Sequence, residues 1–219
     1  TMVNKVAWIT GAGSGIGEAS AIKLSEEGFV VVLSGRTKQA LDAVASKCVG
    51  QVSVKPLDVS NSEDVKGVFK NIISDYGRID VLVASAGLNA KNRNWHNVSD
   101  EDFDQIIKID LNGVFYTNRL VLEKMKEQRE GLIINISSWA GKYVTTLTGP
   151  AYTAAKHGVN ALTEGINMEA GHFGVRACAI CPGEVATPIL DKRPIPVSKE
   201  DKEKMVQPED CAATVAFLA

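Results

Sequence analysis

The chain has 219 residues and a formal net charge of −2, with 45% hydrophobic and 23% charged residues. This length suits one domain, and the balanced charge disfavours a nucleic-acid groove or a polybasic membrane surface. The apolar runs, such as 29–33, are too short to cross a bilayer, and we expect no secretory signal. These features predict a cytoplasmic protein with no nucleic-acid or membrane partner.

Short β-branched runs alternate with longer segments of helical period along the whole chain. The expected strands are 6–10, 29–34, 52–57, 81–85, 132–137 and 175–181. The expected helices are 16–28, 37–48, 62–76, 100–129 and 151–173. Several strands are apolar on both faces, as in a parallel sheet covered on both sides. The pattern predicts an α/β fold, a doubly wound (Rossmann) parallel sheet with helices on both faces in three α/β/α layers.

The first expected strand runs into a glycine-rich turn, Thr10-Gly-Ala-Gly-Ser-Gly-Ile-Gly17, and then directly into a helix. Glycines let the backbone turn sharply and approach a diphosphate, while the helix N-terminus offers free N–H groups. The spacing is T-G-x-x-x-G-x-G rather than G-x-G-x-x-G, because position 16 is isoleucine. This turn predicts a dinucleotide-binding site.

The end of the second expected strand bears on the choice of coenzyme. In such sheets a carboxylate there accepts from the adenosine 2′-hydroxyl, whereas a basic residue accommodates a 2′-phosphate. The sequence has Gly35-Arg36-Thr37 and no acid at this place. Arg36 therefore favours NADP(H), with NAD(H) possible.

Tyr152 and Lys156 are four residues apart in an expected helix, so they project from one face. They follow a strand that ends in Ser137-Ser138, and active sites of open α/β sheets lie beyond the carboxyl ends of strands. A neighbouring ammonium favours the phenolate form of a tyrosine, so Tyr152 can exchange a hydroxyl proton while a nicotinamide carries hydride. The hydroxyl of Ser138 can hold a carbonyl oxygen in place.

Cysteine usage is typical of a reducing compartment rather than of a disulfide scaffold, with only four cysteines in the chain. Cys178 and Cys181 form a C-x-x-C, but positions three apart in a strand face opposite sides, which suits neither a chelate nor a redox pair. The three histidines show no ligand spacing. We expect buried structural thiols and no metal site.

With these motifs in this order, the chain resembles the short-chain dehydrogenase/reductase family over essentially its whole length. The matching motifs are the glycine turn Thr10–Gly17, Asp58-Val59, Asn112 before Gly113, Ser138 with Gly141, Tyr152-x-x-x-Lys156, and Pro182-Gly183 with Thr187. One departure is Ala84-Ser85-Ala86-Gly87, where the family has N-N-A-G. A hydroxyl there makes fewer hydrogen bonds than an amide, which weakens the expected brace between sheet and loop.

The resemblance implies a catalytic tetrad. Asn112 and Lys156 would hold a water-linked proton path, Ser138 would orient the substrate, and Tyr152 would act as acid/base. Lys156 would also bond the nicotinamide ribose. The cofactor contacts it implies are Gly11, Ser14, Gly15, Ile16, Gly17, Arg36, Asp58, Val59, Ala86, Gly87, Tyr152, Lys156, Pro182, Gly183, Val185 and Thr187.

Residues 184–207 are the one irregular stretch, rich in proline and charge, and we expect a mobile substrate lid or a disordered segment there. The rest of 1–219 is expected to be a single dinucleotide-binding domain that carries the catalytic site. The sequence stops at Ala219 within an expected helix, which suggests truncation, and the last strand and tail implied by the resemblance are absent. The resemblance also implies a homodimer or homotetramer, formed through 100–129 and 151–173.

The leading hypothesis is an NAD(P)(H)-dependent oxidoreductase that interconverts a secondary alcohol and a ketone. A second hypothesis is a 3-oxoacyl-carrier-protein reductase, which needs a basic patch for its acidic carrier. Residues 192–193 and 199–204 supply lysine and arginine, but these alternate with acids. A third is a non-catalytic dinucleotide-binding sensor or scaffold, which has no use for the Ser138, Tyr152 and Lys156 set.

Overall fold

The computed structural model describes residues 4–219, which form one α/β domain around a parallel sheet. The sheet has six strands in the order β3-β2-β1-β4-β5-β6. They are β1 (Val6–Thr10), β2 (Val30–Ser34), β3 (Val52–Val54), β4 (Val81–Ala84), β5 (Gly131–Ile136) and β6 (Val175–Ile180). The order reverses between β1 and β4, so a crevice is expected beyond the carboxyl ends of these two strands. The doubly wound fold predicted from the sequence is confirmed.

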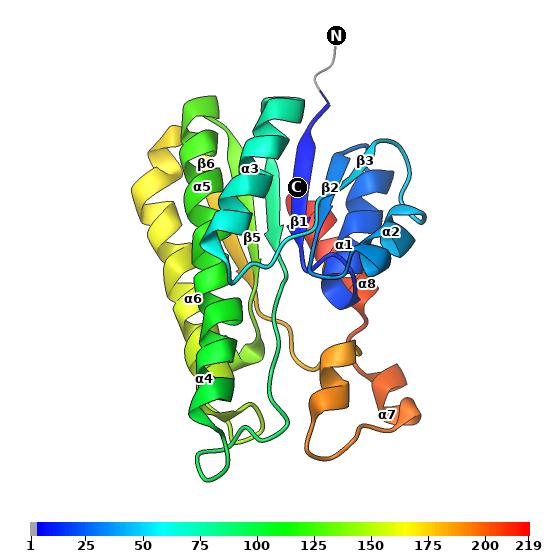
Figure 1. Cartoon of the computed structure of the whole chain (residues 1–219), viewed down its shortest axis with the longest axis vertical. Helices are drawn as coiled ribbons and strands as arrows, with labels where there is room; N and C mark the ends of the chain where they lie inside the picture. Colours follow the sequence, from blue (N-terminus) through cyan, green and yellow to red (C-terminus); the bar gives the residue numbers. More distant parts are fainter. Residues whose placement is uncertain (1–3) are drawn as a thin grey trace.

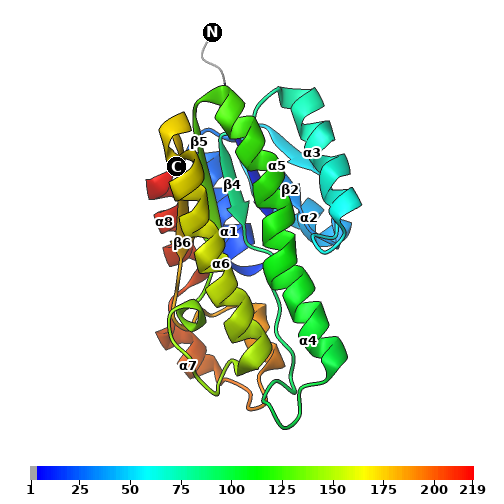
Figure 2. The same cartoon turned by 90° about the vertical axis from the view of Figure 1, so that its left-hand side faces the viewer.

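Helices cover both faces of the sheet (Figure 1, Figure 2). On one side lie α1 (Gly15–Glu26), α2 (Lys38–Ala45) and α8 (Pro208–Leu218). On the other lie α3 (Ser62–Tyr76), α5 (Gly113–Gln128) and α6 (Gly149–Ala170). Successive strand residues point to opposite faces, so Trp8 packs in the α3/α5/α6 core and Ile9 in the α1/α2/α8 core. Each fully buried large side chain contributes about 1.5–3 kcal/mol.

The segment 100–129 differs from its prediction as one helix. It consists of α4 (Asp100–Ile107), the π-helical turn η1 (Lys108–Asn112) and α5. A π turn inserts one extra residue and rotates the following side chains, a change that apolar periodicity does not register. Within η1 the Asp110 side chain is turned inward, where its Oδ1 accepts a hydrogen bond from the Leu88 N–H at 2.9 Å.

The 184–207 stretch has more regular structure than its composition suggests. It contains the 3₁₀ helix η4 (Pro188–Lys192) and the short helix α7 (Lys199–Lys204). A bridge between Val185 and Val206 joins the two ends of the stretch. Two further 3₁₀ turns, η2 (Trp139–Gly141) and η3 (Gly171–Phe173), flank α6. The 184–207 stretch is therefore a folded lobe, placed beside the carboxyl ends of the strands (Figure 1).

The four thiols are all free, but their burial differs from the expectation. Cys211 is buried, whereas Cys48, Cys178 and Cys181 are only half-buried. Cys178 lies on β6, which is an edge strand, so its surroundings are less enclosed than a central strand would provide. Residues 4–219 contain no group of three or more His, Cys, Asp or Glu that could hold a metal, and no helix there is long and apolar enough to span a membrane.

Asp80, just before β4, anchors the start of the sheet. Its buried carboxylate accepts from the Val6 N–H at 2.8 Å and from the guanidinium of Arg78. Asp80→Ala should lower the free energy of unfolding by about 3 kcal/mol, the lower end for a broken buried ion pair, because Arg78 keeps some contact with water. The control is Asp75→Ala, which removes a half-exposed partner of Lys55 and should cost about 1 kcal/mol or less. Urea denaturation of both variants measures the difference, and equal losses would contradict it.

Candidate active site

The glycine turn brings the loops after β1 and β4 into backbone contact. Gly11 has φ +62°, and a Cβ built on it would lie 2.6 Å from the Ala86 backbone nitrogen. A Cβ on Gly17 would lie 2.2 Å from the Gly11 carbonyl oxygen. Gly15 also has positive φ, and its Cα faces the side chain of Thr187. Backbone atoms therefore leave no room for a side chain at Gly11 and Gly17, and a turn of this kind lets backbone N–H groups approach a diphosphate.

The other predicted cofactor residues lie along the same edge of the sheet. Arg36, after β2, is exposed, and within residues 4–219 no acid pairs with it. Asp58, after β3, accepts from the N–H and the hydroxyl of Ser60, at 2.9 and 2.7 Å. Pro182, after β6, accepts through its carbonyl from the Trp139 N–H at 2.8 Å. The remaining predicted contacts lie in these same loops or in the first turn of α1: Ser14, Ile16, Val59, Gly87, Gly183 and Val185.

Tyr152 and Lys156 lie one turn apart on α6, as predicted. Lys156 is only 4% exposed, and its Nζ donates to the Ile136 carbonyl at the end of β5, at 3.0 Å. The same Nζ lies 5.4 Å from the centre of the Tyr152 ring. Tyr152 is half-buried, so its ring is held beside the ammonium while part of it remains accessible.

The end of β5 distinguishes two neighbouring serines. Ser137 is buried, and its hydroxyl donates to the Lys156 carbonyl at 3.4 Å, which ties the strand to α6. Ser138 is half-buried, and its Oγ accepts from the Ala140 N–H at 3.1 Å. Gly141 lies against this junction, since a Cβ there would be 2.8 Å from the Lys156 carbonyl oxygen. Ser138 can therefore present its hydroxyl hydrogen outward.

The η1 turn brings the buried carboxyl of Asp110 near Lys156. Asn112 lies two positions later in the same turn and is half-buried, and its part in a water-linked proton path with Lys156 stays a prediction. A Cβ built on Gly87 would lie 3.6 Å from both Asp110 Oδ2 and Lys156 Nζ. Burial raises the pKa of the Asp110 carboxyl to about 7, although the charge of Lys156 and the Leu88 N–H lower it. In the sequence, the position of Asp110 beside the apolar Ile109 could have indicated a buried acid.

Comparison with known proteins gives matches over most of the chain. Residues 5–195 match the family described as short chain dehydrogenase. The chain is 38% identical over 218 residues to an uncharacterized oxidoreductase of Staphylococcus aureus (strain USA300), covering 99% of this chain and 91% of that protein.

The chain belongs to the short-chain dehydrogenase family.

Solved structures of similar proteins carry nicotinamide dinucleotides. One is an alcohol dehydrogenase from the archaeon Thermococcus sibiricus complexed with 5-hydroxy-NADP (TM-score 0.88, 31% identity, covering 98% of this chain and 89% of that one). Another is a 3-ketoacyl-(acyl-carrier-protein) reductase from Brucella melitensis complexed with NADH (TM-score 0.89, 30% identity, covering 100% and 91%).

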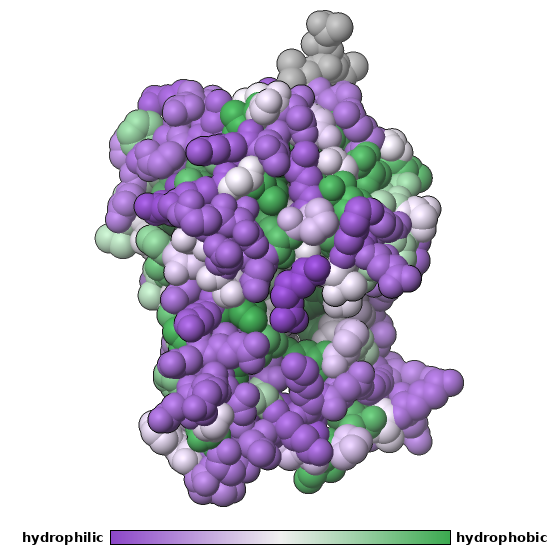
Figure 3. All heavy atoms as spheres, in the orientation of Figure 1, coloured by the Kyte–Doolittle hydropathy of each residue, from purple (hydrophilic) through white to green (hydrophobic). Residues whose placement is uncertain are grey.

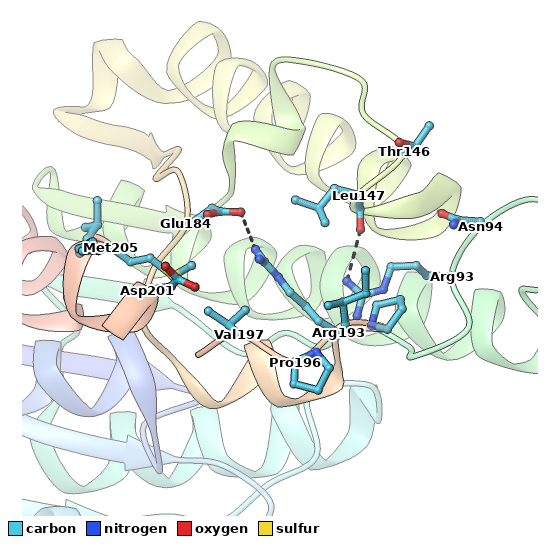
Figure 4. Close-up of a pocket in the computed structure, with 14 residues that line it drawn as sticks. Arg93, Asn94, Thr146, Leu147, Glu184, Arg193, Pro196, Val197, Asp201 and Met205 are labelled. Atoms are coloured by element: carbon cyan, nitrogen blue, oxygen red, sulfur yellow. Dashed lines mark hydrogen bonds and ion pairs between the residues drawn. The ribbon is translucent and has the colours of Figure 1, made fainter. Parts of the chain in front are cut away.

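In this short-chain dehydrogenase, Arg93 joins its own loop to the loop before α6 and to the 184–207 lobe. It is 6% exposed, and its guanidinium donates to the Ala90 and Lys192 carbonyls, each at 2.7 Å. It also donates more weakly to the Leu147 carbonyl (Figure 4). Gly149 has φ +75°, and a Cβ there would lie 2.0 Å from the Arg93 carbonyl oxygen. Sequence reasoning missed both residues because their partners are remote along the chain.

A cavity of about 860 Å³ opens beside Arg93, between the loops and the 184–207 lobe. Its walls include Leu147, Val197 and Met205, and an Arg193–Glu184 ion pair of 2.8 Å crosses it (Figure 4). Burial lowers the pKa of Arg93, the charge of Arg193 lowers it further, and Tyr152 acts in the opposite direction. Figure 3 shows a largely hydrophilic face with a hollow near its middle, where hydrophobic atoms are visible.

Proposed function

We propose that this protein is an NADP(H)-dependent oxidoreductase that interconverts a secondary alcohol and a ketone, with Tyr152 as the acid/base. The observation that carries the proposal is the Tyr152–Lys156 pair. The ammonium is anchored on the Ile136 carbonyl and lies 5.4 Å from the phenol ring, at the sheet edge that also holds the glycine turn. A protein that only bound a dinucleotide would have no use for a phenol placed there.

The residues present fit a nicotinamide dinucleotide, because the turn at Gly11 and Gly17 has no room for side chains. The bound coenzyme would supply or accept the hydride. In reduction, Tyr152 gives its hydroxyl proton to the carbonyl oxygen, and in oxidation its phenolate takes that proton back. The positive charge of Lys156 stabilises the phenolate, and the Ser138 hydroxyl donates to the substrate oxygen.

The preference for NADP(H) rests on Arg36. Its guanidinium is exposed after β2 and unpaired within the described residues, so it is free to meet a 2′-phosphate. The similar solved structures include both kinds of coenzyme, since one is named with 5-hydroxy-NADP and another with NADH. We therefore base the proposed preference for NADP(H) on the positive charge of Arg36.

Arg36→Ala should weaken NADPH binding roughly tenfold or more, because a hydrogen bond to a charged group contributes about 1.5–3 kcal/mol. Binding of NADH should stay at the wild-type level. Fluorescence titration of the purified protein with each coenzyme measures both constants. Lys38→Ala is the matched control, because Lys38 is a nearby exposed cation already paired with Asp42 at 2.7 Å. Equal weakening of NADPH and NADH by Arg36→Ala would overturn the assignment.

A 3-oxoacyl-carrier-protein reductase is the second candidate, favoured by the 30% identity to the Brucella melitensis enzyme. Such an enzyme must meet an acidic carrier with basic side chains. In the 184–207 lobe the cations are largely neutralised, since Arg193 pairs with Glu184, Lys202 with Asp191 and Lys204 with Glu200. We therefore place a small alcohol or ketone first. Assays with free ketones and with a carrier-linked 3-oxoacyl chain separate the two candidates.

A further inference from the structure

Asp110 is a fully buried acid in the active site that the proposed mechanism does not use. Its side chain has 0% exposure, and only Oδ1 is hydrogen-bonded, to the Leu88 N–H. Oδ2 is buried with no hydrogen-bond partner. A buried carboxylate oxygen without a partner carries a large desolvation cost, so its presence calls for a physical explanation.

The groups around the carboxyl come from three elements. Its own η1 turn contributes Lys108, which is exposed. The loop after β4 contributes Gly87 and the Leu88 N–H, and neither is charged. From α6 comes Lys156, the one residue in the described chain whose charge shifts the Asp110 pKa. Asp110 therefore faces a single ionic partner.

Gly87 lies beside both the unpaired oxygen and that partner. A Cβ built on Gly87 would lie 3.6 Å from both Oδ2 and Nζ, so the two atoms lie close to the same point of the loop after β4. They are not in direct ion-pair contact, and the ammonium has its own hydrogen bond to the Ile136 carbonyl. The pair interacts by charge through a low-dielectric space, where charges act strongly.

We propose that Asp110 is a positioning residue for Lys156, and that its carboxylate form holds the lysine ammonium in its working place. This inference rests on the proposed function, because Lys156 acts there on Tyr152. When Oδ2 takes a proton from solvent, the carboxyl becomes neutral and the ammonium loses the nearby negative charge. The proton returns to solvent as pH rises, and no other bond changes. The protonation of Asp110 thus gates the rate in the neutral range, in keeping with its raised pKa.

The first test compares pH profiles of kcat/KM for ketone reduction by NADPH. Asp110→Asn keeps the shape and the acceptor for Leu88 but remains neutral at every pH. Wild type should lose activity as pH falls through about 7, whereas Asp110→Asn should lack that inflection and match wild type below it. Above it the variant should be about tenfold slower. Asp104→Asn, an exposed acid on α4, is the matched control and should follow wild type. Parallel profiles for wild type and Asp110→Asn would overturn the proposal.

The second test requires no turnover, so it separates failure of this inference from failure of the proposed function. Because the folded pKa of Asp110 lies above the unfolded value of 3.8, ionisation of Asp110 destabilises the fold as pH rises. The stability of Asp110→Asn relative to wild type should therefore increase between about pH 4 and about pH 7 and then level off. In a Lys156→Met background the folded pKa of Asp110 should be higher because the lysine charge is gone, so the increase should continue to higher pH before it levels off. An increase that levels off at the same pH in both backgrounds would show that the two groups do not interact. If Asp110→Asn does not fold, carbon-13 NMR of aspartate-labelled wild type gives the answer, and no resonance titrating near pH 7 would overturn the proposal.

Discussion

Tyr152→Phe is expected to abolish most turnover while the dinucleotide still binds. The substitution removes one oxygen from a half-buried ring and leaves the Lys156 ammonium at 5.4 Å from the ring centre. Without the phenol no group is placed to exchange the proton of the substrate hydroxyl. General acid–base catalysis typically contributes about 10²–10⁴-fold, so kcat should fall by about that factor. Stopped-assay product analysis with NADPH and a ketone panel measures kcat, and fluorescence titration measures coenzyme affinity.

The matched control is Tyr143→Phe. Tyr143 is exposed and its ring stacks on Trp139, with centroids 4.9 Å apart. The loss of its hydroxyl leaves that stack intact, so the rate should remain at the wild-type level. A Tyr152→Phe variant that keeps its activity would remove Tyr152 from the acid/base role. Loss of both activity and coenzyme binding would indicate a disturbed site instead of a missing proton donor.

The fold was readable because its determinants are local. A short strand that is apolar on both faces, such as Val30–Ser34, is typical of a parallel sheet buried between two layers of helices. Gly77 and Gly174, in left-handed conformation, end α3 and η3, as glycine commonly does at the end of a helix. The glycine turn was readable for the same reason, since adjacent residues determine both its backbone geometry and the start of α1.

The rest of the site depends on contacts between remote segments. The sequence does not show the structural role of Arg93, because its guanidinium binds the Leu147 and Lys192 carbonyls, which are more than fifty residues away along the chain. The need for glycine at position 149 is visible only in the structure, because the Arg93 carbonyl leaves no room for a side chain there. Asp110 was hidden because a π turn, invisible to a 3.6-residue period, rotates it toward Lys156. Sequence motifs therefore identified the pair that we propose to react, and the structure was needed to find the groups packed around it.

Gly17→Ala should weaken the binding of NADPH and NADH alike, because it disturbs the backbone of the proposed dinucleotide site. Gly17 lies in the first turn of α1, and the added Cβ would sit 2.2 Å from the Gly11 carbonyl oxygen and 2.7 Å from its carbon. These are backbone atoms, which cannot rotate away as a side chain would. Relief requires the turn to move off Ala86, and with it the N–H groups proposed to bind the diphosphate. Overpacking of this kind costs about 1–3 kcal/mol, which at its upper end is roughly a hundredfold in coenzyme affinity.

Gly67→Ala makes the same chemical change where the structure predicts the opposite result. Gly67 lies within α3, and a Cβ there would meet no atom within 4 Å. Alanine should therefore raise the free energy of unfolding by about 0.5–1 kcal/mol through its higher helix propensity. Coenzyme affinity should not change. Thermal denaturation measures the stability of each variant, and NADPH titration measures its coenzyme affinity. If Gly17→Ala bound NADPH as wild type does, the close packing of the turn would not be what forms the dinucleotide site.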